Sequence, residues 1–227
     1  MLRRSLVSIL GCAWCLTGGA VPAVAQDPVK VDPNVKVEFE NARVRILRMT
    51  YQAGVNGPLH THDLPRVIVE LADSRQRADD GTVNERKRNT ARFSEPNTAP
   101  HKAAYLTAAE SIAIELKGAA GTPVPIPPAN ATVVDPGHHS VEFENARVRI
   151  VRMTYPTGYK TPMHSHLPGV TIVLSATSVH SWASDNKESD ATTTAKSASW
   201  SEGGETHANE VRGTTPLELI RVELKTR

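Results

Sequence analysis

Two pairs of histidines, each pair separated by a single residue, carry the clearest chemistry in this chain. One pair lies in PLHTH, which ends at His62, and the other in PMHSH, which ends at His166. On a β-strand, residues i and i+2 point to the same face, so both imidazoles of a pair can reach one ion without a bend in the chain. The pattern indicates metal binding, with the alternative that the histidines are hydrogen-bonded in or near a cavity.

A third histidine follows each pair near the end of the same half of the chain. One lies in SEPNTAPHKAA and the other in SEGGETHANE. Three imidazoles from two separate strands are a sufficient ligand set for a divalent ion of Fe, Zn, Mn, Ni or Cu, with open positions for water or substrate. The candidate metal ligands are His60, His62, His101, His164, His166 and His207.

The chain repeats itself at an offset of 104 residues. Residues 38–62 and 142–166 align without a gap, and 17 of these 25 positions are identical. The ends IAIELKG and IRVELKT also correspond, so the repeated unit has about 90 residues, the size of a small domain. Between the copies lies GAAGTPVPIPPAN, a Pro-rich stretch typical of a stiff linker. We therefore predict domains at 26–117 and 131–227, joined by a linker at 118–130.

Each copy has the pattern of β-strands. In RVRILRMTY the apolar residues fall first at Val44 and Ile46 and then at every second position from Leu47, which indicates a bulge or a strand covered on both faces. Segments 67–71 and 112–116 alternate in the same way, and no segment shows a sustained helical period. Short strands with Gly, Pro and Asn turns predict an all-β sandwich or barrel in each half.

The first 25 residues have the order of a secretory signal peptide. Arg3 and Arg4 precede a short apolar run, and small residues precede Gln26. Glycines interrupt an apolar run that is already shorter than the ~20 residues of a membrane span. We therefore expect cleavage after Ala25, no stable membrane insertion, and a periplasmic or secreted protein. The sequence ILGC also resembles a lipobox, which leaves lipidation at Cys12 open.

Cleavage would change the composition of the chain. Both cysteines would leave, so burial, helped by a metal, would have to stabilise the exported domains. Two of the 26 Lys and Arg would be lost and all 24 Asp and Glu kept, which takes the formal net charge from +2 to zero. A neutral, mixed surface gives no reason to expect nucleic acid as a partner. We expect a small-molecule ligand, and association into a homodimer stays open.

The spacing of the histidines resembles the two sequence motifs of the cupin family. In each copy a glycine and the His-x-His pair match G-x5-H-x-H of the first motif, and the third histidine stands where the second motif has one. The matching residues are Gly54, His60, His62 and His101, then Gly158, His164, His166 and His207. The resemblance covers essentially the whole mature chain. It implies two tandem jelly-roll β-barrels, a bicupin, each with a metal or ligand pocket in its interior.

Both copies depart from the first motif at its glutamate. Metal-binding cupins commonly carry it after the second histidine with three or four residues between, where this chain has Arg66 or Val67 and Val170 or Thr171. The motifs therefore resemble the three-histidine variety, as in thiol dioxygenases, and imply a neutral ligand set with a weaker hold on a cation. Carboxylates that could replace the glutamate are Asp63, Glu202 and Glu205.

The two copies are not equivalent. Arg66 stands where the second copy has Gly169. We interpret Arg66 as a solvated surface charge, with the alternative that it clamps an anionic substrate, and we favour the second copy if only one site binds metal. The basic run 85–88 is interpreted as a solvated hairpin face, and His138 and His139 are interpreted as loop residues.

The residues favour a metal-dependent, dioxygenase-like oxidoreductase that acts on a small organic molecule. Fe(II) or a similar ion would be held by His164, His166 and His207, with open positions for substrate and dioxygen. The alternative is a non-catalytic cupin that binds a small molecule or a metal. A sugar isomerase or epimerase is also open to such a fold, but a fold alone does not choose a chemistry.

Overall fold

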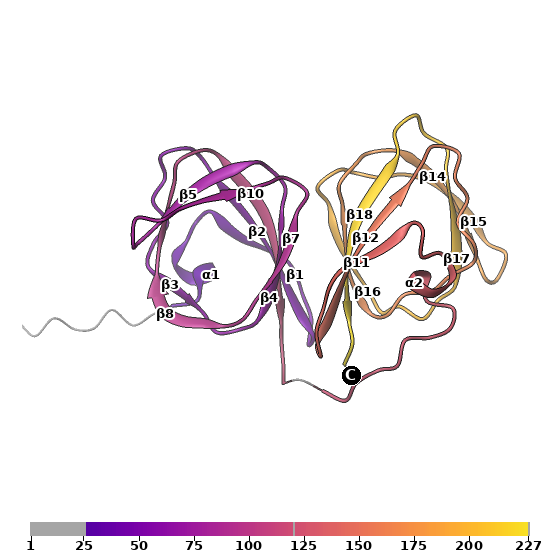
Figure 1. Cartoon of the computed structure of the whole chain (residues 1–227), viewed down its shortest axis with the longest axis horizontal. Coiled ribbons are helices and arrows are strands. Elements are labelled where there is room, and N and C mark those ends of the chain that lie inside the picture. Colours follow the sequence, from indigo (N-terminus) through magenta and orange to yellow (C-terminus); the bar gives the residue numbers. More distant parts are fainter. Residues whose placement is uncertain (1–25, 120, 227) are drawn as a thin grey trace, which may run out of the picture.

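The computed structural model describes residues 26–119 and 121–226. Figure 1 shows two β-barrels side by side, the first coloured from indigo to magenta and the second from orange to yellow. Each barrel is preceded by a one-turn helix, α1 (Pro28–Val31) or α2 (Ala131–Val134). The predicted all-β fold of two tandem jelly-roll barrels is therefore confirmed. The expected signal peptide and Cys12 lie outside the described residues.

The first barrel is built from three sheets. Their strand orders are β1-β2-β10-β4-β7, β6-β5-β9 and β3-β8. The strands are β1 (Val35–Glu40), β2 (Val44–Tyr51), β3 (His60–His62), β4 (Arg66–Glu70), β5 (Ser74–Ala78), β6 (Val83–Arg86), β7 (Ala91–Ser94), β8 (Asn97–His101), β9 (Ala103–Tyr105) and β10 (Ala109–Leu116). All of their pairings are antiparallel.

The second barrel repeats this plan. Its sheets have the orders β11-β12-β18-β13-β16 and β15-β14-β17. The strands are β11 (His139–Glu144), β12 (Val148–Tyr155), β13 (Gly169–Val173), β14 (Ser178–Ala183), β15 (Glu188–Thr192), β16 (Ala198–Ser201), β17 (His207–Val211) and β18 (Leu217–Leu224). An isolated antiparallel bridge between His164 and His207 takes the place of the β3-β8 pair. The two five-stranded sheets therefore correspond strand for strand.

Strand β2 shows why the apolar pattern changes position along the sequence. Its register with β10 is regular, so it has no bulge; the irregularity lies in β1, between Val37 and Phe39. Ile46 points away from the barrel into the largest apolar cluster, and Leu47 points into the barrel interior. Of the two alternatives, a strand covered on both faces is confirmed.

The largest buried apolar cluster lies between the barrels. It combines the outer faces of both five-stranded sheets, which pack against each other (Figure 1). The first barrel contributes Val44, Ile46, Val67, Val69, Leu71, Ile112, Ile114 and Leu116, and the second contributes Val148, Ile150, Val170, Ile172, Ile220, Val222 and Leu224. Each barrel therefore stabilises the other through apolar burial, the dominant favourable term in folding.

Contacts around this layer occur in matching pairs. Phe39 stacks on Trp200, with ring centroids 6.5 Å apart, and Phe93 stacks on Phe143 at 5.3 Å. Arg48 donates to the backbone oxygen of Lys196, and its counterpart Arg152 donates to that of Asn89, both at 2.6 Å. The acceptors occupy equivalent turns. The pairing gives the two barrels an approximate two-fold relation, as their repeated sequences require.

A glycine turn leads from the end of β2 or β12 toward each histidine pair. Gly54 has φ +83° and Gly158 has φ +77°, a conformation that glycine adopts without the strain of a side chain. The Gly54 amide donates to the Tyr105 oxygen at 2.7 Å, and the Gly158 amide donates to the Val211 oxygen at 2.8 Å. Each turn is thereby attached to the segment that carries the third histidine.

Within the described residues no helix is long and apolar enough to cross a membrane.

The shared apolar layer predicts that the barrels unfold together. Ile150 is fully buried in that layer, so Ile150→Ala should lower the free energy of unfolding by about 2–5 kcal/mol. Urea unfolding followed by circular dichroism and by hydrogen exchange should show one shifted transition for both halves. Val141→Ala, at a side chain 43% exposed, is the control and should change stability by less than about 0.5 kcal/mol. Separate transitions, with only the second barrel affected, would contradict a shared core.

Candidate metal centres

The first triad is assembled by two short paired strands. His60 and His62 lie on β3, and His60 pairs in register with His101 at the end of β8. One ligand atom from each of the three side chains lies within 4.8 Å of the others. The Nε2 atoms of His60 and His62 are 3.1 Å apart. That separation is close to the one expected for two nitrogens that each lie about 2.1 Å from one ion at roughly a right angle.

The second triad has the same construction. The amide of His164 donates to the His207 oxygen at 2.9 Å, and the amide of His207 donates back at 2.8 Å. One ligand atom from each of His164, His166 and His207 lies within 4.8 Å of the others. Among the described residues both converging groups consist of histidines only, without a carboxylate.

Backbone carbonyls fix the tautomer of the leading histidines. The Nδ1 atom of His60 lies 2.8 Å from the Pro58 oxygen, and that of His164 lies 2.8 Å from the Pro162 oxygen. A carbonyl only accepts hydrogen bonds, so Nδ1 carries the proton and Nε2 presents a lone pair. Nε2 of His164 is buried and has no hydrogen-bond partner within the described part of the chain. An imidazole with a protonated Nδ1 and an unpartnered Nε2 lone pair can bind a metal ion.

Burial favours the neutral form of five imidazoles of the two triads. Desolvation, as the largest cause, lowers the pKa of His62 to about 2, that of His166 to about 3 and that of His207 to about 4. The pKa values of His60 and His164 are also lowered by burial. Neutral imidazoles are the form that binds a metal, so the ligands need not lose a proton at neutral pH.

A buried carboxylate supports the second triad. Glu223 on β18 is 1% exposed, and its Oε1 lies 3.4 Å from Nδ1 of His166. Burial alone would raise the pKa of Glu223, but hydrogen bonds from His166 and Asn130 and the charge of Arg221 hold it below its usual value. A carboxylate behind a histidine fixes the ring and increases its basicity.

The first triad lacks this support. Glu115 is the counterpart of Glu223, but its Oε2 accepts from Nε of Arg45 at 2.6 Å, and Nδ1 of His62 has no partner among the described residues. Sequence reasoning missed both glutamates as site residues. The signal was present, because both copies end in Glu-Leu-Lys.

The interpretation of Arg66 as a solvated charge is wrong. Arg66 is 9% exposed and lines the interior of the first barrel, where burial lowers its pKa to about 10. It pairs with Glu115 on β10 as Gly169 pairs with Glu223 on β18, so the two positions are equivalent. The sequence could not show that Arg66 faces the interior. Strand β4 is buried on both faces, so its residue pattern does not distinguish the inner face from the outer one.

The second barrel carries its interior arginine on a different strand. Arg221 on β18 stands where the first barrel has Ala113, and burial lowers its pKa to about 10. It forms three hydrogen bonds through its Nη atoms: it donates to the oxygen of Leu167 at 2.6 Å, to Thr171 Oγ1 at 2.7 Å and to Ser201 Oγ at 3.0 Å. Its Nε is buried and has no hydrogen-bond partner among the described residues.

His139 is also misplaced by sequence reasoning. His138 lies in a turn, but His139 opens strand β11 and is 3% exposed, with its ring centroid 5.4 Å from that of His164. Its Nδ1 donates to the Asp135 oxygen at 2.8 Å, and the Tyr155 hydroxyl lies 2.6 Å from its Nε2. The repeat contained the signal, since His139 aligns with the buried Val35.

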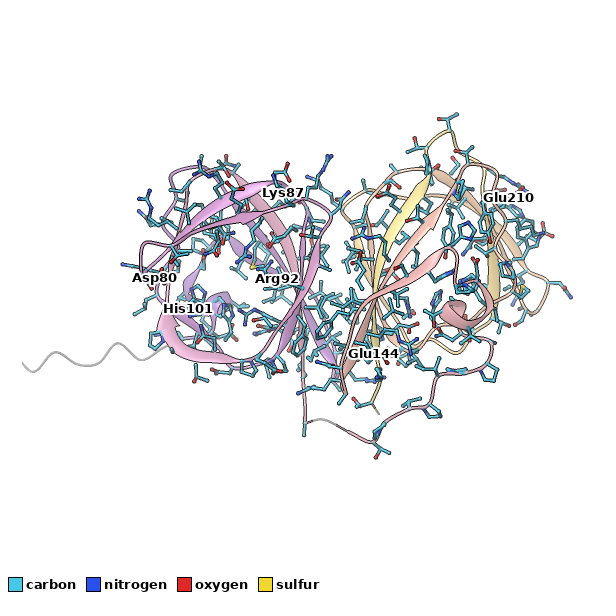
Figure 2. The ribbon with its side chains drawn as sticks, viewed as in Figure 1. Asp80, Lys87, Arg92, His101, Glu144 and Glu210 are labelled. Atoms are coloured by element: carbon cyan, nitrogen blue, oxygen red, sulfur yellow. The ribbon has the colours of Figure 1, made fainter. Side chains whose placement is uncertain are left out.

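A cavity of about 210 Å³ fills the interior of the first barrel beside its triad. Its polar lining includes the three histidines, Arg66, Arg86 and Tyr105. In Figure 2 the labelled side chains of His101 and Arg92 both lie within the outline of this barrel. An outer pocket of about 230 Å³ shares His62 and Glu115 with the cavity, so the first triad is approached from two sides.

The carboxylates considered as substitutes for the motif glutamate belong to neither converging group, although Asp63 lines the outer pocket with His62. Asp63, Glu202 and Glu205 are exposed, and Glu202 accepts from Trp200 Nε1 at 2.7 Å. The basic run 85–88 is mixed: Arg88 is exposed, whereas Nε of Arg86 is buried in the cavity lining.

Comparison with solved structures places this architecture in the cupin fold. AerE from Microcystis aeruginosa has 12% identity and a TM-score of 0.58, over 88% of this chain and 97% of that one. A cupin 2 conserved barrel protein from Leptotrichia buccalis has 10% identity and a TM-score of 0.53, over 84% and 88%. Oxalate decarboxylase from Bacillus subtilis, a protein with Mn(II) centres, has 12% identity and a TM-score of 0.53, over 85% and 75%.

At these identities the similarity defines the fold and leaves the activity open. No family model matches the sequence, and no curated protein is similar to it. The chain thus has the two-barrel cupin fold, with one histidine triad in each barrel.

Proposed function

We propose that each barrel binds one divalent metal ion through its three histidines. The observation that carries this proposal is the convergence of three imidazoles in each barrel, with Nδ1 of His60 and of His164 held by backbone carbonyls and Nδ1 of His166 close to Glu223. Such rings direct lone pairs at one point, which is the arrangement that metal sites require. The Mn(II) centres of a neighbour with the same fold give further support for a divalent ion.

We propose further that the protein is a dioxygenase-like oxidoreductase for a small organic molecule, with the reaction at the first triad. A bound ion such as Fe(II) would supply positions for substrate and dioxygen that three histidines leave open. The first barrel offers the space, a cavity of about 210 Å³ beside the triad. Tyr105 lines it, and burial raises the pKa of Tyr105 to about 12, so its phenol keeps its proton.

The alternative is a non-catalytic module that binds a metal or a small molecule. It is favoured by the converging ligand atoms, which among the described residues include no carboxylate. Nitric oxide added without oxygen to the iron-loaded protein separates the two functions. A paramagnetic nitrosyl signal that His60→Ala removes supports an open, reactive ion in the first barrel. Absence of that signal from a fully loaded protein supports the non-catalytic module.

We also propose export to the periplasm or beyond, on the order of basic, apolar and small residues in positions 1–25. The full chain expressed with its N-terminus should yield a protein whose intact mass begins at Gln26. An acylated chain that begins at Cys12 would show lipidation. A chain that still carries residues 1–25 would contradict export.

The metal proposal predicts two ions per exported chain, measured by inductively coupled plasma mass spectrometry after purification without chelators. His60→Ala and His164→Ala should each lower the content to one ion, because each removes a ligand from a different triad. His138→Ala is the matched control, since His138 lies in a turn near the second triad without belonging to it. A substoichiometric metal content that no histidine variant changes would overturn the proposal.

The carboxylate behind His166 predicts unequal metal affinities. Glu223→Gln should weaken binding at the second site by roughly 10- to 100-fold, measured by competition with a chelator, because His166 loses its acceptor. Glu115→Gln is the matched change in the first barrel. It should leave metal affinity there within about threefold, since Glu115 bonds Arg45 instead of a ligand. Equal losses at both sites would argue against this role of Glu223.

A further inference from the structure

We propose that the cavity of the first barrel binds a small organic carboxylate through Arg66 and Arg86, next to the histidine triad. This inference deepens the proposed function, because it names the substrate class of the first centre. The second barrel uses its own interior arginine for structure and does not share the role.

Both arginines offer unused donors. Nη1 of Arg66 and Nε of Arg86 are buried and have no hydrogen-bond partner within the described residues. Both side chains line the cavity that the three histidines line. Among the described residues neither guanidinium forms an ion pair. A buried cation such as Arg66 without an ion-pair partner is strongly unfavourable, so its place beside a cavity indicates a ligand that compensates it. Arg86 is half-buried and adds a second donor.

The acids in the same cavity are already paired. Glu70 forms an ion pair with Arg92, and Glu115 forms one with Arg45. Burial lowers the pKa of Arg66 only to about 10, so the side chain stays charged at neutral pH. The three histidines add no negative charge. A divalent ion at the triad would increase the positive excess, so the cavity favours an anion more strongly once the metal is bound.

The shape of the site favours a carboxylate. A guanidinium presents parallel N–H groups that match the two oxygens of a carboxylate. The rest of the lining includes Leu47, Met49 and Ile68, which can contact a short carbon chain. A volume of about 210 Å³ restricts the ligand to a few heavy atoms. The arrangement fits a short-chain organic acid with its carboxylate at the arginines and its other end toward the metal.

The second barrel supplies an internal comparison. A Cβ at Gly169, the position equivalent to Arg66, would lie 2.2 Å from the oxygen of Val222, so no side chain fits there. In that barrel Arg221 instead donates three hydrogen bonds to oxygen atoms of the protein. In the first barrel Ala113 occupies the position of Arg221 and leaves room. The second barrel also has buried arginine nitrogens without a hydrogen-bond partner, Nε of Arg149 and Nε of Arg221, but both guanidinium groups lie within 4.0 Å of a carboxylate. Among the described residues, buried arginine nitrogens that line a cavity without such an ion pair are therefore found in the first barrel.

The test measures binding of acetate, malonate and succinate to the exported full chain by calorimetry, with and without added metal. Malonamide and inorganic phosphate are the comparison ligands. We expect at least one carboxylate to bind, with malonamide and phosphate at least tenfold weaker. Arg66→Gln and Arg86→Gln should each weaken that carboxylate at least tenfold. Arg88→Gln removes an exposed charge from the same segment and should leave binding unchanged.

A thermal unfolding scan without ligand separates a binding role from a structural one. Removing an unpartnered buried charge should leave the Tm of Arg66→Gln unchanged or higher, whereas a fall would mark Arg66 as structural and overturn the inference. If Arg66→Gln does not fold, two other variants decide the case. One is Arg66→Lys, which keeps the charge but loses the paired donors, and the other is Arg86→Gln. Equal carboxylate binding by these variants, or phosphate binding as tight as that of every carboxylate, would also overturn it.

Metal content measured on the same samples separates this inference from the proposed function. A chain that holds metal but binds none of the carboxylates overturns the inference and leaves the metal sites standing. A chain that binds a carboxylate through Arg66 without holding metal supports the inference and overturns the metal proposal.

Discussion

The apolar layer between the two five-stranded sheets determines which side chains can face the barrel interiors. Strand residues alternate between faces, and in each barrel one face of the central strands is committed to the layer. Polar residues on those strands are thereby directed inward. Arg45 and Glu115 in the first barrel, and Arg221 and Glu223 in the second, lie on that inner face. The layer therefore stabilises both barrels without contributing a side chain to either histidine triad.

Charges in such an interior cost free energy unless each has a partner. In the second barrel much of this charge is compensated: Arg221 is hydrogen-bonded to three oxygens, and Glu223 accepts from Asn130 and lies against His166. Nε of Arg221 and Oε2 of Glu223 nevertheless have no hydrogen-bond partner among the described residues. In the first barrel Arg66 keeps an unpartnered nitrogen beside a cavity. An unpartnered buried charge lowers the stability of the fold. The fold tolerates it because the apolar layer, to which both barrels contribute, stabilises the protein independently of either interior.

Features that depend on the spacing of residues along the sequence could be predicted. Features that depend on which face of a strand a side chain occupies were missed. The repeat and the His-x-His pattern were enough for two barrels with a triad in each, since period and register are local properties. The interior position of Arg66 and the carboxylate support from Glu223 were not recovered. Both lie on strands covered on two sides, where an inward residue and an outward residue look alike. His139 was recoverable, because its aligned partner Val35 is an apolar residue at the start of the same strand.

Duplication explains how one chain can hold two interiors in which an arginine is held differently. Arg66 pairs in register with Glu115, whereas Arg221 lies on the same strand as Glu223, so the two arginines stand on strands that are neighbours in the sheet. A close approach of strands at Gly169 excludes a side chain from the first of these positions in the second barrel. The small Ala113 leaves space at the other position in the first. One copy therefore holds an arginine with three hydrogen bonds to the protein, and the other holds arginine donors without a partner beside a cavity.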